Sequence, residues 1–222
     1  MKNIRYISVL LSLCALCALF LCACKGEQKT PPPDLDSIKD ELVSRIENSK
    51  EVNDIFWGEG LPVIEIGSDE AEELGLYTEY NPITVDDYGE WEYIDPSRTD
   101  LVSILAIKEL AETAYSDAFL APVYTSQFEG LYDSVSGDVL NPHYYEDDYW
   151  LWKNANSEEE FPSVGATRLF NYETMKMDEE KSSGERIYVT VDSHIEGESE
   201  IQKITLAFDK QEDGWYLSSP TY

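Results

Sequence analysis

The last part of the chain alternates apolar with polar residues, and this pattern limits the fold more than any other feature of the sequence. The alternation is clear in residues 187–195 and 203–208, which the turn Glu196-Gly197-Glu198 separates. Residues 166–177 are rich in β-forming side chains, and a short run at 215–218 closes the series. Because successive side chains of a strand point to opposite faces, each run predicts a strand with one buried face. Four such strands in succession predict an antiparallel meander.

An amphipathic helix is predicted near the start of the region that follows the prolines at 31–33. Asp34 or Asp36 is a good N-cap, and the helix is expected to end near Ser49. Its apolar side chains fall on one face at three- and four-residue spacing: Leu35, Ile38, Leu42 and Ile46.

A second helix is predicted to begin at Thr99 or Asp100 and to end at Pro122. Its stripe of apolar and small side chains, suited to lying on a sheet, is Ile104, Ile107, Ala111, Ala114 and Ala118. Between the helices, residues 55–95 are rich in Gly, Pro and aromatic residues, which predicts short extended pieces and loops. We expect residues 81–98 to be an irregular, acidic lead-in to the second helix.

The predicted helices come first along the chain and the meander comes last, and this order predicts an α+β fold. This plan resembles the NTF2-like and cystatin-like superfamilies, which implies a cone in which a long helix packs on a curved antiparallel sheet. The closing residues Gly214-Trp215-Tyr216-Leu217 and Ser219-Pro220-Thr221-Tyr222 are similar to the last strand of small extracytoplasmic lipoproteins of Gram-positive bacteria. Phe56-Trp57 and Glu129-Gly130-Leu131-Tyr132 resemble secreted inhibitors of cell-wall DL-endopeptidases. No catalytic residue follows from these resemblances.

The N-terminus has the pattern of an export signal. Lys2 and Arg5 precede an apolar run over residues 7–21, as in a secretory signal peptide. The run ends in Leu21-Cys22-Ala23-Cys24, which resembles the bacterial lipobox. The resemblance implies that residues 1–23 are a removable lipoprotein signal peptide and that the thiol of Cys24 carries a lipid such as a palmitoylated diacylglycerol. An uncleaved transmembrane anchor and ordinary cleavage with secretion stay open as alternatives.

The segment after Cys24 is predicted to be a spacer. Residues 24–33 are the lipidated cysteine and a polar tether that ends in three prolines, which favour an extended conformation and prevent a helix. Residues 34–222 are then expected to form a single acidic α+β domain, with the aromatic content needed for a core: 15 Tyr, 7 Phe and 5 Trp.

The composition excludes several classes of function. The chain has 45 acidic and 16 basic residues, a net charge of -29, and loss of Lys2 and Arg5 with the signal peptide takes it to -31. So acidic a domain repels nucleic acid and anionic lipid, which leaves the acyl chains to hold it at the membrane. Of the four cysteines only Cys24 would remain, so a disulfide, a cysteine-based zinc site and a free cysteine nucleophile are excluded.

Residues 143–152 are the richest candidate for a binding site. Aromatic rings offer stacking faces to a glycan or peptide, and carboxylates accept hydrogen bonds from hydroxyls or amines. The residues proposed as ligand-binding are Tyr145, Tyr149, Trp150, Trp152 and Asp148. In the alternative interpretation, the rings pack in the core and the acidic side chains are solvated.

Catalytic and metal sites have weaker support. Asp86, Asp87, Glu90 and Glu92 alternate with aromatic residues and offer oxygen ligands to Ca²⁺, but their spacing matches no EF-hand loop. His143 and His194 are both expected at the surface, because no nucleophile elbow, zinc motif or phosphate loop accompanies them. We therefore predict no catalytic residue, no metal and no cofactor.

The sequence thus predicts a lipid-anchored lipoprotein on the extracytoplasmic face of the cell membrane. Its domain is expected to be a non-enzymatic module that binds a glycan or peptide ligand or an envelope protein. Two alternatives stay open: an inhibitor of cell-wall hydrolases, and an NTF2-like enzyme acting on a small molecule. A cavity lined by aromatic rings and a buried carboxylate favours ligand binding or catalysis, whereas a filled interior with a protruding acidic loop favours inhibition.

Overall fold

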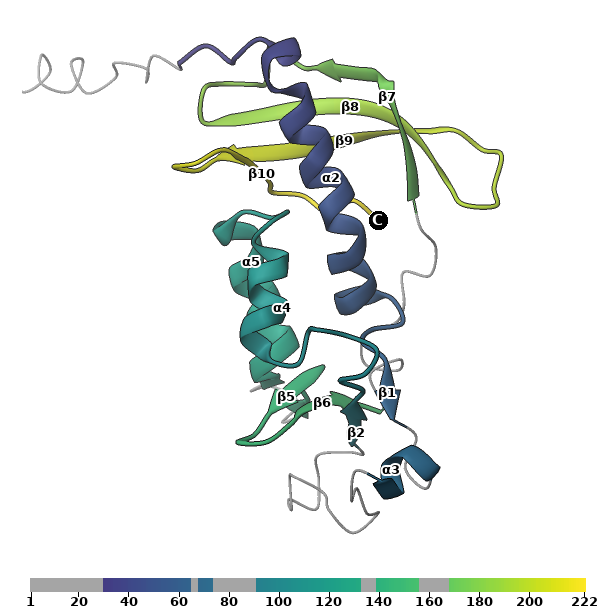
Figure 1. Ribbon diagram of the computed structural model, residues 1–222. Helices are drawn as coiled ribbons and strands as arrows, with labels where there is room; N and C mark the ends of the chain where they lie inside the picture. Colours follow the sequence, from purple (N-terminus) through teal and green to yellow (C-terminus); the bar gives the residue numbers. More distant parts are fainter. Residues whose placement is uncertain (1–29, 65–67, 74–90, 133–138, 156–167) are drawn as a thin grey trace, which may run out of the picture. The chain divides into compact units, whose positions relative to one another are not determined.

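The computed structural model (Figure 1) describes residues 30–64, 68–73, 91–132, 139–155 and 168–222. Residues 32–222 form one compact unit. Its helices are α2 (Leu35–Trp57), α3 (Asp69–Glu73), α4 (Ile104–Ala111), α5 (Asp117–Tyr124) and the π-helix η1 (Thr125–Glu129). Its strands are β1 (Val63–Ile64), β2 (Trp91–Ile94), β3 (Leu131–Tyr132), β4 (Val139–Leu140), β5 (Tyr144–Glu146), β6 (Leu151–Asn154), β7 (Arg168–Met177), β8 (Arg186–Ile195), β9 (Gln202–Lys210) and β10 (Trp215–Leu217).

The predicted meander is confirmed. Strands β7 to β10 form an antiparallel sheet in the order β10-β9-β8-β7. In β8 the side chains of Ile187, Val189 and Val191 are fully buried, and those between them are only half-buried, as the alternation predicts. Gly197 has φ of 85° in the turn between β8 and β9, a conformation that glycine adopts without strain.

Helix α2 starts where the sequence predicts and ends two turns later than expected. The carboxylate of Asp34 accepts a hydrogen bond from the backbone N–H of Asp36 and so caps the helix. Ser49 does not end it, because its buried hydroxyl donates to the carbonyl of Ile46 and pairs with the Thr221 hydroxyl, both at 2.7 Å. The apolar face then continues through three further buried side chains, Val52, Ile55 and Phe56.

The second predicted helix is broken into two, and Pro122 lies inside α5 instead of ending the helix. The hydroxyls of Ser103 and Ser116 cap α4 and α5 respectively. Between the two helices, the N–H of Ser116 donates to the carbonyl of Leu217 at 2.8 Å and the N–H of Leu217 donates to the carbonyl of Ala114 at 3.0 Å. The helix is interrupted because its backbone pairs here with β10 and covers the outer edge of that strand.

A second antiparallel sheet, in the order β1-β2-β6-β5, was not predicted as such. Strand β2 lies within the stretch expected to be an irregular lead-in, and Trp91, Tyr93 and Ile94 in it are buried. Trp91 and Tyr93 are two positions apart, so both rings reach the same face of the strand, where they pack with Trp152 of β6. The α+β plan is therefore confirmed, with two four-stranded sheets and the small β3–β4 hairpin.

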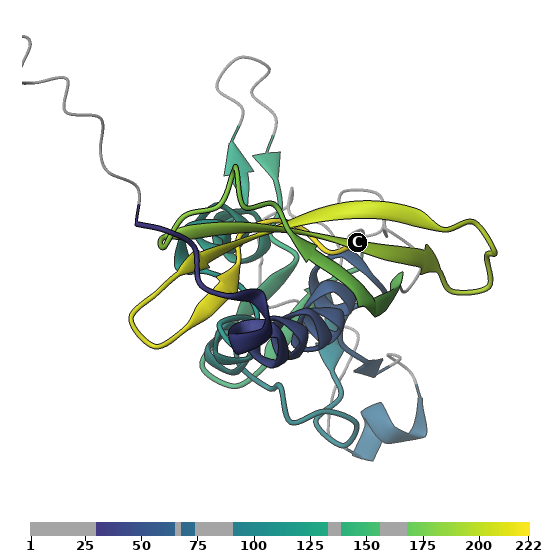
Figure 2. The same ribbon diagram turned by 90° about the horizontal axis from the view of Figure 1, so that it is seen from above.

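Helix α2 packs against both the meander and α4, and Figures 1 and 2 both show it along one face of the meander. At the C-terminal end of α2, the hydroxyl of Tyr144 donates to the carbonyl of Ile55 and accepts from the N–H of Leu61, both at 3.0 Å. These bonds attach β5 to α2. In the part of the chain described, no helix combines the length and hydropathy that spanning a bilayer requires.

Two charged residues one turn apart on α2 hold the last strand of the meander. The guanidinium of Arg45 donates to the carbonyl of Trp215 at 3.1 Å and to that of Thr113 at 2.6 Å. It also lies 3.8 Å from the centre of the Tyr216 ring. The carboxylate of Glu41 accepts a hydrogen bond from the N–H of Trp215 at 2.6 Å. Together they join α2, β10 and the C-terminal end of α4.

We expect Arg45→Met to lower the free energy of unfolding by about 2–3 kcal/mol, because two half-buried carbonyls lose a charged donor while the apolar volume is kept. Urea-induced unfolding followed by tryptophan fluorescence measures the change. Lys50→Met is the matched control on the same helix, since Lys50 makes only an i,i+3 ion pair with Glu47 at 2.6 Å. The control is expected to change stability by less than about 0.5 kcal/mol. Equal losses in the two variants would contradict the role given to Arg45.

Candidate functional site

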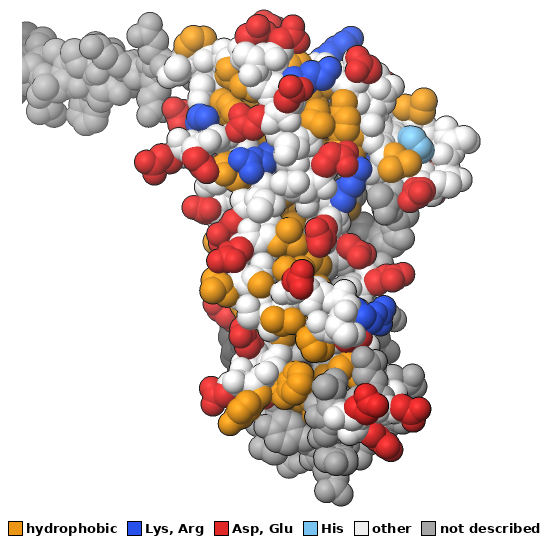
Figure 3. All heavy atoms as spheres, viewed as in Figure 1, with side chains coloured by type: hydrophobic (Ala, Val, Ile, Leu, Met, Phe, Trp, Pro, Cys, Tyr) orange, Lys and Arg blue, Asp and Glu red, His pale blue; other side chains and the backbone are white. Residues whose placement is uncertain are grey.

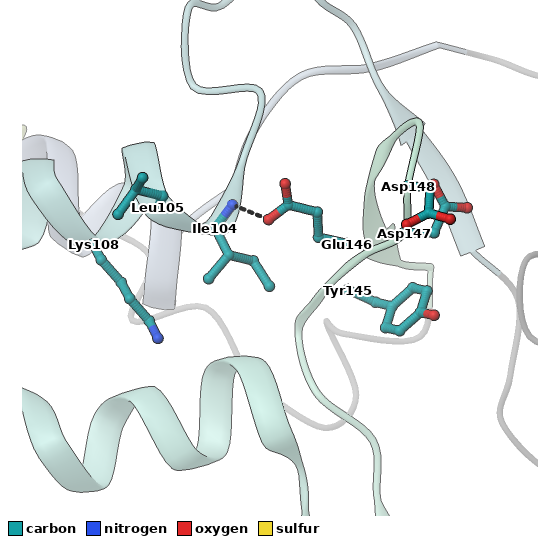
Figure 4. A pocket seen from close by; sticks show the side chains of 7 residues that line it. All are labelled: Ile104, Leu105, Lys108, Tyr145, Glu146, Asp147 and Asp148. Carbon is teal, nitrogen blue, oxygen red and sulfur yellow. Dashed lines mark hydrogen bonds between the residues drawn. The ribbon is translucent and has the colours of Figure 1, made fainter.

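A cleft of about 690 Å³ opens between α4 and the β5–β6 hairpin (Figure 4). We call it the acidic cleft. One wall is Ile104, Leu105 and Lys108 of α4, and the other is Tyr145, Glu146, Asp147 and Asp148 of the hairpin. Its volume falls within the range of sites that bind small molecules or peptide segments.

Asp147 fixes the shape of the hairpin tip. One oxygen of its carboxylate accepts hydrogen bonds from the N–H groups of Tyr149 and Trp150, both at 2.8 Å. The other accepts from the indole N–H of Trp152 at 3.2 Å. Aspartate favours turns because its side chain bonds to nearby backbone in this way. Its carboxylate is therefore committed to the hairpin, and the exposed Asp148 beside it is available to a ligand.

Glu146 joins the hairpin to α4. Its Oε2 accepts a hydrogen bond from the N–H of Ile104, the first residue of the helix, at 2.9 Å (Figure 4). The N–H groups of a first helical turn have no partner within the helix, and the helix dipole favours an anion there. This bond uses one oxygen of the carboxylate and holds the two walls of the cleft together.

Lys108 does not neutralise these carboxylates. Its amine lies 5.0 Å from the centre of the Tyr124 ring and 5.2 Å from that of Phe128, which is within the range of a cation–π interaction. Figure 4 shows the amine directed away from Glu146, Asp147 and Asp148. Among the described residues, no ion pair forms with any of the three. The cleft is therefore lined by three carboxylates and one amine and has a net negative charge.

Apolar side chains are exposed beside this charge. Leu105 in the cleft is 65% exposed, Tyr149 at the hairpin tip is 79% exposed, and Val102 just before α4 is 48% exposed. Figure 3 shows hydrophobic side chains beside acidic ones over α4 and the hairpin. Exposed large apolar residues next to charge are a common property of surfaces that bind another protein.

The structure divides the five residues predicted to bind a ligand. Tyr145 and Asp148 line the acidic cleft, and Tyr149 is exposed next to it. Trp152 is fully buried, with its ring 4.0 Å from that of Tyr93, and the half-buried Trp150 meets the same tyrosine edge-on at 6.0 Å. These two tryptophans pack with the aromatic core of the second sheet. Ligand binding by the other three stays a prediction.

The remaining predicted sites are placed only in part. Cys24 lies outside the described residues, as do Asp86, Asp87 and Glu90 of the suggested calcium ligands, while Glu92 is half-buried in β2. No cluster of three or more His, Cys, Asp and Glu side chains suited to a metal occurs in the described ranges. His194 is half-buried on β8, where Asp192 on the same face lies 4.0 Å from the amine of Lys203.

His143 lies in a loop as expected but not at the surface, since it is only 2% exposed. Its Nδ1 is 2.9 Å from the side-chain carbonyl oxygen of Gln127, which is itself buried in η1, so we assign the proton to Nδ1. The ring stacks on that of Tyr144 at 4.4 Å. Burial, together with the charge of Lys153, lowers the pKa of His143 to about 3. The imidazole is therefore neutral and structural at physiological pH.

Sequence analysis did not find the α4 wall of the cleft. Leu105 and Lys108 lie within the second predicted helix but outside its apolar stripe, and their spacing does not indicate a cleft. The bond between Glu146 and Ile104 joins residues 42 positions apart, which local spacing does not reveal.

The comparisons give no family for this fold and site. No protein-family model, no curated protein and no solved structure matches the chain.

The neutral state of His143 makes stability depend on pH. Below about pH 6.5 the imidazole gains a proton in the unfolded chain but not in the native one, so native stability falls as pH falls toward 3. The loss from this group approaches about 1.4 kcal/mol per pH unit. Urea unfolding of wild type and His143→Gln at pH 8, 7, 6 and 5 tests this. The stability difference between them is expected to be constant above pH 7 and to shrink below pH 6. Parallel loss of stability would contradict the assignment.

Proposed function

We propose that this protein is a lipid-anchored lipoprotein on the extracytoplasmic face of the cell membrane. We further propose that its domain is a non-enzymatic binding module for a basic, partly apolar segment of an envelope protein. The observation that carries the second proposal is the acidic cleft, in which carboxylates border the exposed Leu105 and Tyr149. The anchor is supported by the sequence Leu21-Cys22-Ala23-Cys24 alone.

The cleft suits a lysine or arginine side chain of a partner. Such side chains bury an aliphatic stem along apolar surface and keep the charged head in a polar environment. Leu105 and the Tyr145 ring offer that apolar surface, and the second oxygen of Glu146 and the carboxylate of Asp148 accept the charged donors. The net charge of -29 adds long-range attraction that speeds the encounter with a basic partner.

The filled interior disfavours catalysis in a cone and, with the acidic hairpin at the surface, favours binding to another protein, which includes inhibition of a hydrolase. An NTF2-like enzyme would need a hollow between the helix and the curved sheet. Between α2 and the meander of this chain, Leu42, Ile46, Val189, Leu206 and Phe208 are all fully buried in one core. Asp192 and His194 alternate with the buried positions of β8 and so lie on the other face of that strand. The inhibitor alternative uses the same acidic hairpin and is distinguished by whether binding lowers the activity of a hydrolase.

The anchor is tested by Cys24→Ala. Without the thiol no lipid is attached, so we expect the precursor to keep residues 1–23 and its mature form to be lost from the lipoprotein pool. Mass spectrometry of the N-terminus and metabolic labelling with a palmitate analogue measure cleavage and lipid attachment. A variant that is still cleaved before residue 24 and still labelled would refute the lipobox.

The cleft is tested with two synthetic peptides, one alternating lysine with leucine and one alternating glutamate with leucine. We expect the basic peptide alone to bind, with an affinity that falls as salt rises. Leu105→Ala and Asp148→Lys are each expected to weaken binding about tenfold, as loss of a contact in an interface hot spot does. Titration calorimetry measures each dissociation constant.

Matched controls come from the loop between β8 and β9. Ile201→Ala removes an apolar side chain that is 72% exposed, and Glu196→Lys reverses an exposed charge. Neither lines the cleft, so both are expected to bind the basic peptide as wild type does. If they weaken binding as much as the cleft variants, binding depends on general charge and surface hydrophobicity and the cleft is not the binding site.

A further inference from the structure

Helix α5 is more apolar than its burial explains. After Asp117, its seven residues Ala118, Phe119, Leu120, Ala121, Pro122, Val123 and Tyr124 are all apolar or aromatic, yet only Leu120 is buried. Ala118, Ala121 and Pro122 are exposed, and Phe119 and Val123 are half-buried. A surface helix is normally polar on the face away from the core. The uncovered face of α5 is therefore suited to contact with something apolar.

That face borders a second hollow, which we call the C-terminal pocket, of about 380 Å³. Its apolar lining comes from three places: the end of α2, one side of α5 and the last residue. These residues are Trp57, Ala118, Phe119, Pro122, Val123 and Tyr222. The rings of Trp57 and Tyr222 lie 4.8 Å apart. Ser218 and the pair Arg186 and Asp209 complete the lining.

A buried polar network holds these walls in place. The hydroxyl of Thr221 lies 2.7 Å from that of Ser49 and accepts a hydrogen bond from the amide of Asn53 at 2.7 Å. The hydroxyl of Tyr115 donates to Asn53 at 2.6 Å, and its ring stacks on Phe119 at 4.6 Å. The network thereby fixes both Phe119 and the residue that precedes Tyr222. The pocket is formed before any ligand arrives, which lowers the entropic cost of binding.

The polar side of the pocket carries both signs of charge. Arg186 and Asp209 face each other across β8 and β9, and the guanidinium Nε and Nη2 donate to the two carboxylate oxygens of Asp209. A guanidinium has five N–H donors and a carboxylate about four acceptor positions, so this pairing leaves both groups with capacity for a ligand. Arg186 is 50% exposed and Asp209 is 18% exposed at their side chains.

We propose that the C-terminal pocket binds a small zwitterion with an apolar body, of the class of the free apolar α-amino acids. The apolar side chain of the ligand lies among Trp57, Phe119 and Val123. The ligand carboxylate accepts hydrogen bonds from Arg186, and its ammonium donates to Asp209. This site uses different residues from the acidic cleft and stands whether or not the cleft binds a peptide.

The charge pattern favours this class over others. A purely anionic ligand meets repulsion from Asp209, and a purely cationic one meets repulsion from Arg186. A hydrocarbon without a polar head leaves the charged pair without new partners while bringing it out of water. An α-amino acid carries its ammonium and its carboxylate on the same carbon atom. It therefore gives Arg186 an acceptor and Asp209 a donor at once, and it leaves the net charge of the site unchanged.

The test uses three probes that share a phenyl ring: L-phenylalanine, phenethylamine, which lacks the carboxylate, and 3-phenylpropionate, which lacks the ammonium. L-leucine is added as an aliphatic zwitterion. By calorimetry and NMR titration of the full chain in detergent, we expect the two amino acids to bind with dissociation constants on the order of 0.1–1 mM. The two truncated probes are expected to bind at least about tenfold more weakly, because each loses a charged hydrogen bond.

Paired variants locate the binding. Ala118→Trp fills the pocket from an exposed position and is expected to abolish binding, while Ala121→Trp, exposed on the same helix but outside the pocket, is expected to leave it unchanged. Arg186→Gln no longer bonds the ligand carboxylate, so this variant is expected to bind phenethylamine as tightly as L-phenylalanine. Asp209→Asn no longer carries the charge that pairs with the ligand ammonium, so this variant is expected to bind 3-phenylpropionate as tightly as L-phenylalanine. The charge control is Lys181→Gln. It removes a positive charge outside the pocket, where the amine of Lys181 forms an exposed ion pair of 2.9 Å with Asp178.

Three results would overturn the proposal. The first is that neither amino acid binds wild type. The second is that the truncated probes bind as tightly as L-phenylalanine, which would reduce the site to a hydrophobic patch. The third is that Ala121→Trp blocks binding as well as Ala118→Trp does. Ala118 and Ala121 are both exposed, so neither substitution disturbs the core. The comparison between them stands even if the Arg186 and Asp209 variants do not fold, and circular dichroism checks whether those variants fold.

Discussion

The contact of Arg45 and Glu41 with the last strand of the meander determines how the rest of the domain is assembled. Through it, one face of α2 meets the backbone of β10 and the carbonyl at the end of α4. The sheet, the helix pair and the C-terminal residues meet here, and the bonds of Ser116 with Leu217 and of Thr221 with Ser49 join the same parts. One wall of the acidic cleft lies on α4, and one wall of the C-terminal pocket lies at the end of α2.

The elements that the sequence predicts well are those whose pattern is local. Alternation in residues 187–208 depends on one buried face, and it identifies β8 and β9 correctly. The errors occur where distant backbone or side chains intervene. A stripe of alanines continues through residues 111–118, but pairing with Leu217 interrupts the helix there. Ser49 has the polarity of a helix end, but Thr221, 172 residues away, provides it with a partner inside the core.

The candidate site shows the same division between local and distant information. The interpretation in which the rings pack in the core holds for Trp152, whereas Tyr149 lies in solvent and its role in ligand binding stays a prediction. The acidic and aromatic content of that stretch was visible in the sequence. The opposite wall on α4 and the burial of His143 against Gln127 depend on packing between separate elements, and no single stretch of sequence shows them.

The bond between Ser49 and Thr221 also has a consequence for the timing of folding. It joins residues 172 positions apart, and β10 is attached to α2 over a similar separation. Contacts this distant in sequence form slowly, because the chain must first close a long loop. During synthesis α2 emerges early, and the part of its apolar face that packs against β7 and β10 stays uncovered until those strands have been added. A chain with this order of elements completes its core only when its last strand is available to pair.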